Sequence, residues 1–199
     1  MTTKQDLANP GSGMQIAIRT MQASDLETVE ALDRMSFTMP WPRSAYSYEL
    51  HENPMSMLWV AELTGSTDST ALTTNPGQAA QVIGMVVVWL IIDEAHIATI
   101  AVHPELRGQG IARQLLKTAL LGAIERGMLS ATLEVRVSNE PARRLYQRFK
   151  FEEVGRRPRY YRDNNEDALI MTVEGLGPAY RDWLERDGLA EPPPAEMQR

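Results

Sequence analysis

Residues 100 to 113 read Ile100-Ala101-Val102-His103-Pro104-Glu105-Leu106-Arg107-Gly108-Gln109-Gly110-Ile111-Ala112-Arg113, and they decide which fold we expect. A β-branched strand runs into a turn with two glycines, and a helical pattern starts at Gly110. Glycines let backbone N–H groups approach a ligand closely, and a helix N-terminus adds unpaired donors and about half a positive charge. The turn has the outline of an anion site suited to a pyrophosphate, although a glycine-rich strand-to-helix turn without a ligand explains the same residues.

Two other phosphate-binding motifs fit this turn poorly. A P-loop carries Lys followed by Ser or Thr, and a dinucleotide-binding unit carries an acidic residue about 20 positions further on. The stretch from Gly108 lacks the first pair and places no acidic residue where the second motif needs one. The sequence therefore disfavours ATP and NAD as ligands.

The hydrophobic pattern on either side of this turn alternates between strands and helices. Two nearly continuous apolar runs, 82–92 and 95–102, predict an antiparallel pair at the centre of a sheet, buried on both faces. The other expected strands are 16–20, 57–63, 129–137, 151–157 and 168–173, and the expected helices start near 24, 43, 110 and 139. The order βααβββαβαββ predicts an α/β fold with a central mixed, mostly antiparallel, twisted sheet and helices on both faces.

The chain is expected to hold one domain with two tails. Residues 1–14 are polar and rich in turn formers, so we expect a flexible lead-in before a domain over 15–174. Within that domain, 64–81 is rich in Thr, Ser, Gly and Asn, which predicts an inserted mobile loop. Residues 175–199 form a C-terminal extension in which 180–186 can add a turn or two of helix and the last part is disordered.

Composition excludes several classes of protein. The net charge of -6 argues against direct nucleic-acid binding and favours a basic partner. The chain has no cysteine and three scattered histidines. We therefore expect no disulfide framework, no thiolate nucleophile and no metal site. The longest apolar stretch is too short to span a bilayer, and no signal pattern precedes the domain, so we expect a soluble cytoplasmic protein without membrane contact.

A carboxylate and a phenol are the candidates for proton transfer. In the strand 131–137, Glu134 and Arg136 share the face opposite the apolar residues, which also fits an ordinary solvent face. Tyr146 lies on the next helix, on the side of Leu145 and Phe149, where a core aromatic is the plainer interpretation. Transfer to an amine needs a base and an acid, and this pair can divide those tasks.

The motif Arg107-x-x-Gly110-x-Ala112 after an apolar strand resembles the coenzyme A signature of the GNAT superfamily of N-acetyltransferases. The resemblance implies the GNAT fold and acetyl-CoA as co-substrate, without a metal. It also implies that backbone groups of the strand receive the acetyl-pantetheine arm and that the glycine turn wraps the pyrophosphate. The cofactor-binding residues implied in this way are Ile100, Ala101, Val102, Arg107, Gly108, Gln109, Gly110, Ile111, Ala112 and Arg113.

The stretch 133–151 is similar to the segment that carries the site of the RimI branch, which acetylates the N-terminal alanine of a ribosomal protein. The stretches 37–41, 93–97, 157–161 and 166–171 extend the resemblance, which covers about 16–173. It implies a catalytic Glu134 and Tyr146 and a cofactor-contacting Asn139. The candidates for lining the peptide channel are Trp41, Tyr160 and Tyr161, although these aromatic residues could equally well pack in the protein interior. The acidic pair Glu166 and Asp167 either attracts a basic residue of the acceptor or forms a solvated turn.

Three features depart from the RimI pattern: Lys150 stands where Gly is usual, the 64–81 loop is long, and residues 175–199 have no counterpart. The Lys150 change can alter the turn into the next strand, but it touches neither of the two proposed catalytic side chains.

The resemblance implies direct acetyl transfer from acetyl-CoA to the α-amino group of a protein, with the N-terminal alanine of a small-subunit ribosomal protein as the expected partner. In this scheme acetyl-CoA lies between the 95–102 strand and the Glu134 strand. Two alternatives stay open: a GNAT enzyme that acts on a lysine side chain or a small amine, and a non-catalytic acetyl-CoA sensor or docking module. The sequence gives no indication of the oligomeric state.

Overall fold

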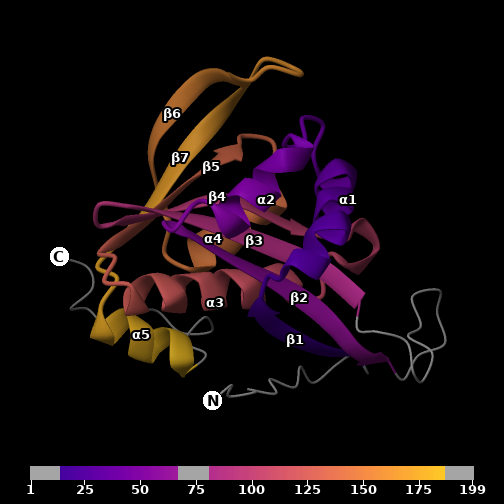
Figure 1. Cartoon of the computed structure of the whole chain (residues 1–199). Coiled ribbons are helices and arrows are strands. Elements are labelled where there is room, and N and C mark those ends of the chain that lie inside the picture. Colours follow the sequence, from indigo (N-terminus) through magenta and orange to yellow (C-terminus); the bar gives the residue numbers. More distant parts are fainter. Residues whose placement is uncertain (1–13, 67–80, 187–199) are drawn as a thin grey trace. The chain divides into compact units, whose positions relative to one another are not determined.

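A mixed sheet of seven strands forms the frame of the chain in the computed structural model, which describes residues 14–66 and 81–186 (Figure 1). The strands are β1 Met14–Thr20, β2 Ser56–Ser66, β3 Gln81–Ile91, β4 Glu94–Val102, β5 Ser130–Arg136, β6 Glu152–Tyr161 and β7 Glu166–Glu174. The helices are α1 Leu26–Ser36, α2 Arg43–His51, α3 Ile111–Glu125, α4 Glu140–Arg148 and α5 Pro178–Glu185, with 3-10 turns η1 Ala23–Asp25 and η2 Pro104–Leu106.

The sheet has the order β1-β2-β3-β4-β5-β7-β6. β1 pairs antiparallel with β2, β7 pairs antiparallel with both β5 and β6, and β4 pairs parallel with β5. The predicted mixed sheet is therefore confirmed, and β6 lies at its edge beside β7.

The strands that flank the predicted loop reach further into it than the sequence indicated. Thr64 to Ser66 continue β2, and Gln81 begins β3, so the ends of the predicted 64–81 loop belong to the sheet. The pairs Met14↔Ser66 and Gln15↔Gly65 extend the ladder with β1, which gives these polar residues backbone partners. Residues 67–80 of the predicted loop, the lead-in 1–13 and the segment 187–199 lie outside the described residues.

The chain divides into two units, and β3 and β4 contribute residues to both. The first unit contains the chain up to Pro54, Leu58–Val86 and Ile100–Leu115, and the second contains Met55–Met57, Val87–Thr99 and the chain from Leu116 onward. Each unit has its own buried apolar side chains. The first buries Val29, Leu32, Tyr46, Val60, Leu63, Ile83, Met85, Ile111 and Leu115, and the second buries Leu116, Leu120, Leu133, Phe149, Phe151, Leu169, Met171 and Tyr180.

The burial of β3 follows its composition. Seven consecutive residues from Val82 to Val88 are buried. Along the rest of the strand Leu90 is also buried, Gln81 and Trp89 are half-buried, and Ile91 is exposed. A strand that alternated polar and apolar residues would bury only every second side chain. The expectation that 82–92 is buried on both faces is confirmed for most of its length.

The residues Ser24-Asp25-Leu26-Glu27 have the pattern of a capping box, but the entry to α1 is built differently. Ser24 is exposed, and the buried Asp25 carboxylate accepts instead from the backbone N–H of Gln22 at 2.8 Å. The Arg19 guanidinium from β1 donates to the same carboxylate at 2.7 and 2.9 Å and to Glu62 of β2 at 3.0 Å. Asp25 therefore takes the place of Ser24 as the residue that accepts a backbone N–H at the entry to α1, and its ion pair with Arg19 holds it there.

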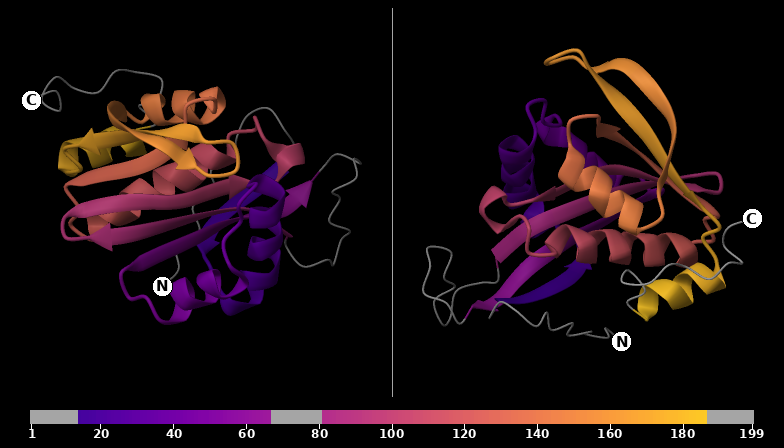
Figure 2. Two further views of the ribbon diagram at one scale, coloured as in Figure 1. Left: turned by 90° about the horizontal axis from the view of Figure 1, so that it is seen from above. Right: turned by 180° about the vertical axis from the view of Figure 1, so that it is seen from behind.

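Part of the C-terminal extension packs into the second unit. α5 lies beside the C-terminal part of α3, where Arg181 Nη2 is 3.0 Å from Glu125 Oε1 (Figure 2). The buried Tyr180 hydroxyl donates to the carbonyl of Phe149 at 2.6 Å, and Trp183 and Leu184 are also buried. The expected turn or two of helix is therefore present as the eight residues of α5, and it is packed.

Lys150 has a left-handed backbone, which explains why glycine is usual at this place. Its φ is +65°, and its N–H bonds to the carbonyl of Gln147 at 3.0 Å just after α4. A side chain in this region costs about 1 kcal/mol, so Lys150→Gly is expected to raise the free energy of unfolding by about that amount. Chemical denaturation checks this, and an equal gain in Lys150→Ala, which keeps the Cβ, would contradict the backbone explanation.

No described helix is both long and apolar enough to cross a membrane.

Candidate active site

The glycine turn has the backbone geometry that the sequence predicts for an anion site. Gly108 and Gly110 both have a φ of +81°, a conformation that side chains rarely adopt. The first intrahelical bond of α3 runs from the N–H of Gln114 to the carbonyl of Gly110 at 3.1 Å. The N–H groups of Ile111 and Ala112 therefore precede the first bonded turn, as helix geometry requires. These donors and the helix dipole favour an anion.

The strand before the turn is held in place by its neighbours in the first unit. A Cβ at Gly84 of β3 would lie 3.1 Å from the carbonyl oxygen of Ala101 and 3.1 Å from Cδ1 of Leu115, so the absence of a side chain allows close packing. The carbonyl of Val102, expected to face the acetyl-pantetheine arm, accepts a bond from Nε of Arg107 at 3.2 Å. Arg107 is thereby fixed at the start of the turn with its charge beside the glycines.

Glu134 of β5 has a side-chain partner on each carboxylate oxygen. Nε2 of His96, from β4, lies 3.2 Å from Oε2, and Nη2 of Arg157, from β6, lies 3.1 Å from Oε1. The Glu134 side chain is 10% exposed, so the carboxylate is recessed from solvent. Glu134 therefore does not lie on an ordinary solvent-exposed face of the sheet, which was the alternative that the strand pattern allowed.

Sheet register brings His96 next to Glu134. The parallel pairing of β4 with β5 runs from Glu94↔Ser130 to His96↔Thr132, and no further pair follows in the described part of these two strands. His96 thus lies at the last paired position and Glu134 two residues beyond its partner. The imidazole stacks on the ring of Trp89 from β3, with the centroids 5.7 Å apart and the planes 14° apart. This stacking orients the ring edge toward the carboxylate.

These contacts keep Glu134 ionised. The hydrogen bond from His96 lowers the pKa of Glu134 below its usual 4.5, against the opposing effect of burial, and the charge of Arg157 lowers it further. A carboxylate with this environment remains an anion across the neutral range. It can hold an ammonium group and accept a proton from it in the course of a reaction.

Tyr146 is a buried phenol on α4 in the same unit. Its ring lies 5.9 Å from that of Phe151, and its carbonyl accepts from the N–H groups of Phe149 and Phe151. Burial raises the pKa of its hydroxyl well above 10, and the neighbouring Tyr161 raises this pKa further. The pKa of Tyr161 itself is raised to about 12, first by burial, and the charge of Glu134 contributes to that shift. Tyr161 is therefore close to both proposed catalytic groups.

Asn139 caps α4. Its Oδ1 accepts the N–H of Ala142 at 3.2 Å, and Pro141 occupies the first turn, as the sequence predicts. The residue is exposed, so the cap leaves its amide group accessible. Asn139 as a contact for the cofactor stays a prediction.

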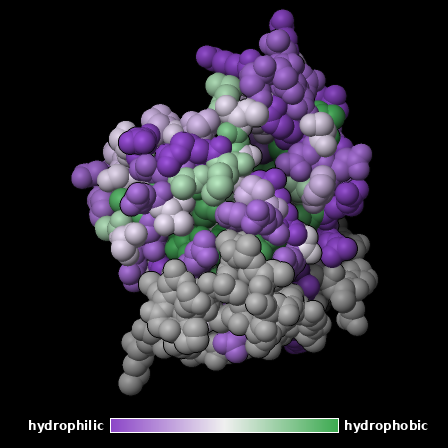
Figure 3. Space-filling model, turned by 90° about the vertical axis from the view of Figure 1, so that its right-hand side faces the viewer, coloured by the Kyte–Doolittle hydropathy of each residue, from purple (hydrophilic) through white to green (hydrophobic). Residues whose placement is uncertain are grey.

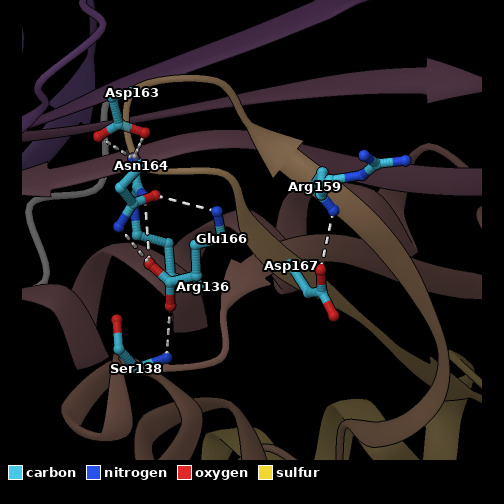
Figure 4. Close-up of polar contacts among 7 residues, drawn as sticks. All are labelled: Arg136, Ser138, Arg159, Asp163, Asn164, Glu166 and Asp167. Carbon is cyan, nitrogen blue, oxygen red and sulfur yellow. Dashed lines mark hydrogen bonds and ion pairs between the residues drawn. The ribbon is translucent and has the colours of Figure 1, made fainter.

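A polar network closes the end of the β6–β7 hairpin (Figure 4). The Arg136 guanidinium is within 2.8 to 3.1 Å of Asp163, Asn164 and Glu166, and its Cζ lies 3.8 Å from the centroid of the Tyr161 ring. Glu166 also accepts the N–H of Ser138 at 2.7 Å, and hydrogen bonds from Ser138 are the main cause that lowers its pKa to about 2.

The acidic pair of the hairpin thus has internal partners. Asp167 accepts the backbone N–H of Arg159 at 2.8 Å, where the strand takes a φ of +51° (Figure 4). Glu166 is neither a solvated turn residue nor an open charge for an acceptor, because Arg136 and Ser138 use both of its oxygens. The network shapes the hairpin that carries Tyr160 and Tyr161.

Trp41 belongs to the first unit, in the segment between α1 and α2. Its backbone N–H donates to the buried Asp33 at 2.6 Å, and its ring stacks on Tyr46 with centroids 5.1 Å apart. Met35, Phe37 and Met39 just before it are exposed, and apolar side chains stand among polar ones on the face shown in Figure 3. Trp41 has the packing role that the sequence allowed, and the segment beside it keeps apolar side chains at the surface.

Comparison with known proteins gives the family. The model of the acetyltransferase (GNAT) family matches residues 26–151, more than half of the chain. The chain belongs to the GNAT acetyltransferase family. It is therefore an acetyl-CoA-dependent N-acetyltransferase, and the turn at Gly108 and the strand before it occupy the matched region.

Relatives of this GNAT enzyme match it over most of their length. A Bacillus subtilis protein, named provisionally as a ribosomal protein bS18-alanine N-acetyltransferase, is 37% identical over 157 residues, covering 79% of this chain and 94% of its own. The ribosomal protein bS18-alanine N-acetyltransferase of Escherichia coli K12 is 30% identical, covering 78% and 95%. The crystal structure of the Escherichia coli ribosomal-protein-S18-alanine N-acetyltransferase matches with a TM-score of 0.66 and 26% identity, covering 83% and 96%.

The sequence-predicted residues of this GNAT enzyme fall into two sets. Glu134, Asn139, Tyr146, Tyr160 and Tyr161 lie in the second unit, and Trp41 with the cofactor turn lies in the first. Sequence reasoning gave no role to His96, Trp89 and Arg157. The available signal for His96 was its place among the even-numbered, half-buried residues of β4, but its pairing with Glu134 depends on register.

Proposed function

We propose that this enzyme transfers the acetyl group of acetyl-CoA to the N-terminal α-amino group of a protein, and that the acceptor is the N-terminal alanine of a small-subunit ribosomal protein. The observation that carries the proposal is the recessed Glu134 anion between His96 and Arg157. The acceptor is that of the Escherichia coli relatives, which are ribosomal-protein-S18-alanine N-acetyltransferases, and this chain covers nearly their whole length.

An α-amino acceptor suits a carboxylate of low basicity. The reference pKa of an α-amino group is about 7.7 to 8.0, against about 10.4 for a lysine side chain, so a larger fraction of it is neutral near pH 7. Glu134, whose pKa is held below 4.5 by His96, binds the ammonium form strongly and abstracts its proton weakly. This combination is adequate for an N-terminus and poor for lysine.

The reaction needs one proton removed from nitrogen and one supplied to sulfur. The neutral amine attacks the thioester carbonyl carbon, the carbon–sulfur bond breaks, and the nitrogen loses its proton toward Glu134. His96 on Oε2 stabilises the carboxylate and can pass the proton to solvent, so that Glu134 and His96 act as a pair. Tyr146 donates to the departing sulfur, and backbone N–H groups of the β4 strand stabilise the oxyanion.

The cofactor turn fits the anionic part of acetyl-CoA. Gly108 and Gly110 allow the backbone to turn its N–H groups toward a pyrophosphate at the N-terminus of α3, and Arg107 and Arg113 add positive charge in the same stretch. When bound, acetyl-CoA supplies the activated acetyl group as a thioester. We assign its binding to Ile100–Val102, to 107–113 and to Asn139.

The test measures acetyl transfer by purified enzyme to a panel of acceptors. The panel contains short peptides beginning with Ala-Arg, the same peptides with a blocked N-terminus, lysine peptides and small amines. We expect transfer to the free alanine terminus alone. Transfer only to lysine or to a small amine would keep the family and reject the acceptor, and tight binding of acetyl-CoA without turnover would favour a sensor.

A further inference from the structure

Arg157 and Glu134 form an ion pair between a recessed anion and an accessible cation. The Glu134 side chain is 10% exposed, whereas that of Arg157 is 54% exposed, and Nη2 to Oε1 is 3.1 Å. Because about half of the Arg157 side chain is already exposed to water, its release from the carboxylate costs little in solvation. The carboxylate has no such freedom, because His96 holds its other oxygen.

The sheet explains how Arg157 reaches across two strands. Arg136, Ala168 and Arg157 lie in one row across β5, β7 and β6, and Glu134 pairs with Ile170 in the adjacent row of the same face. Ala168 in the middle is small and fully buried, which leaves room for a long side chain to pass over it. Arg157 stands where the regular register between β6 and β7 breaks off.

Arg157 also has a second position within reach. Its Cζ lies 5.6 Å from the centroid of the Tyr160 ring, which is 43% exposed, so a cation that leaves Glu134 can rest on an aromatic face. Arg136 in the same row differs, because Asp163, Asn164 and Glu166 hold its guanidinium over Tyr161. Of these two arginines, Arg157 is the one that can move.

An acceptor ammonium and the Arg157 guanidinium need the same binding position. Each is a cation with several N–H donors, and each needs the oxygen of Glu134 that His96 does not use. Two cations at one carboxylate oxygen repel one another, so each lowers the affinity of that oxygen for the other. An amine that binds weakly does not displace Arg157, whereas an acceptor held by further contacts does.

We propose that Arg157 competes with the acceptor amine for Oε1 of Glu134 and so sets the affinity of the enzyme for its acceptor. The proposal rests on the proposed function, since it concerns the same acceptor site. Arg157 is a specificity-determining residue in this scheme: it leaves Glu134 when the acceptor ammonium arrives, and it takes no part in the bond changes.

The experiment compares Arg157→Gln with wild type and with Arg156→Gln. Arg156 is a matched control because it lies next to Arg157 on β6, is 51% exposed, and pairs at 3.8 Å with Glu153 and Asp167. We expect Arg157→Gln to lower the acceptor KM about two- to fivefold, which is the range of an exposed ion pair. We expect kcat and the acetyl-CoA KM to stay unchanged, and Arg156→Gln and Arg157→Lys to keep the wild-type acceptor KM.

A carboxyl titration by carbon-13 NMR, assigned with Glu134→Gln, tests the ion pair without turnover. Arg157 lowers the pKa of Glu134, so Arg157→Gln is expected to raise this pKa. An acceptor KM that is unchanged or higher in Arg157→Gln, in an enzyme that acetylates the peptide, would overturn the competition alone. Failure of every variant to acetylate any α-amino acceptor would overturn the proposed function, and the competition with it.

Discussion

Glu134→Gln is expected to lower kcat on the order of 10²-fold or more, which is the usual contribution of a general base. Glutamine keeps the size of the side chain and removes its charge. The variant loses the anion that holds the acceptor ammonium, and it loses the proton acceptor paired with His96 at 3.2 Å. The effect belongs mainly to kcat, because the proton leaves nitrogen in the transition state.

The measurement is steady-state transfer to the Ala-Arg peptide, with thermal unfolding as a check on the fold. Glu153→Gln is a suitable control, because this carboxylate lies on β6 and pairs only loosely with Arg156, at 3.8 Å. Its turnover is expected to match wild type. Unchanged turnover of Glu134→Gln in a folded protein would remove Glu134 from the mechanism.

The direction of the Glu134 pKa shift predicts how stability and activity depend on pH. The folded pKa of Glu134 is lower than its usual 4.5, so its ion contacts contribute stability above pH 4.5 and lose it as the pH falls through the lower folded value. Across pH 6 to 8 the carboxylate does not change charge. A rise of kcat/KM in that range therefore does not report Glu134, whereas the acceptor ammonium, whose reference pKa is about 7.7 to 8.0, loses its proton there.

The places of Glu134 and Tyr146 in the fold were predictable from sequence because the information about them is local. Strand alternation places Glu134 on the face away from the apolar residues, and Asn139 with Pro141 fixes the start of the helix that carries Tyr146. The left-handed position of Lys150 was also implied by the usual glycine there. In each case the deciding residues lie within a few positions of one another.

His96 and Arg157 were not predictable from sequence because their contacts depend on which strands are neighbours. His96 is 38 residues before Glu134 and Arg157 is 23 residues after it, and they meet the carboxylate only through the order β4-β5-β7-β6 and its registers. Side-chain charge alone does not reveal such pairs.

Tyr146→Phe is expected to lower kcat by about 10²-fold while leaving the KM of both substrates near their wild-type values. The hydroxyl is the only group that this change removes, and the ring contact with Phe151 at 5.9 Å stays. The pKa of Tyr146 is raised by burial, so the phenol is fully protonated at neutral pH and can donate a hydrogen bond. The same shift makes it a weak acid, so its main effect is to stabilise the charge that develops on sulfur as the thiolate leaves.

Two features separate this role from a structural one. Because the phenol keeps its proton between pH 6 and 9, the ratio of wild-type to Tyr146→Phe turnover is expected to stay constant over that range, as measured by pH-dependent steady-state rates. Tyr180→Phe is the control: it removes the buried hydroxyl that donates to Phe149 at 2.6 Å, so it should lower stability by about 1–3 kcal/mol and leave kcat unchanged. If Tyr146→Phe lost stability in the same way but kept its turnover, Tyr146 would be a core aromatic, and the departing sulfur would need another donor.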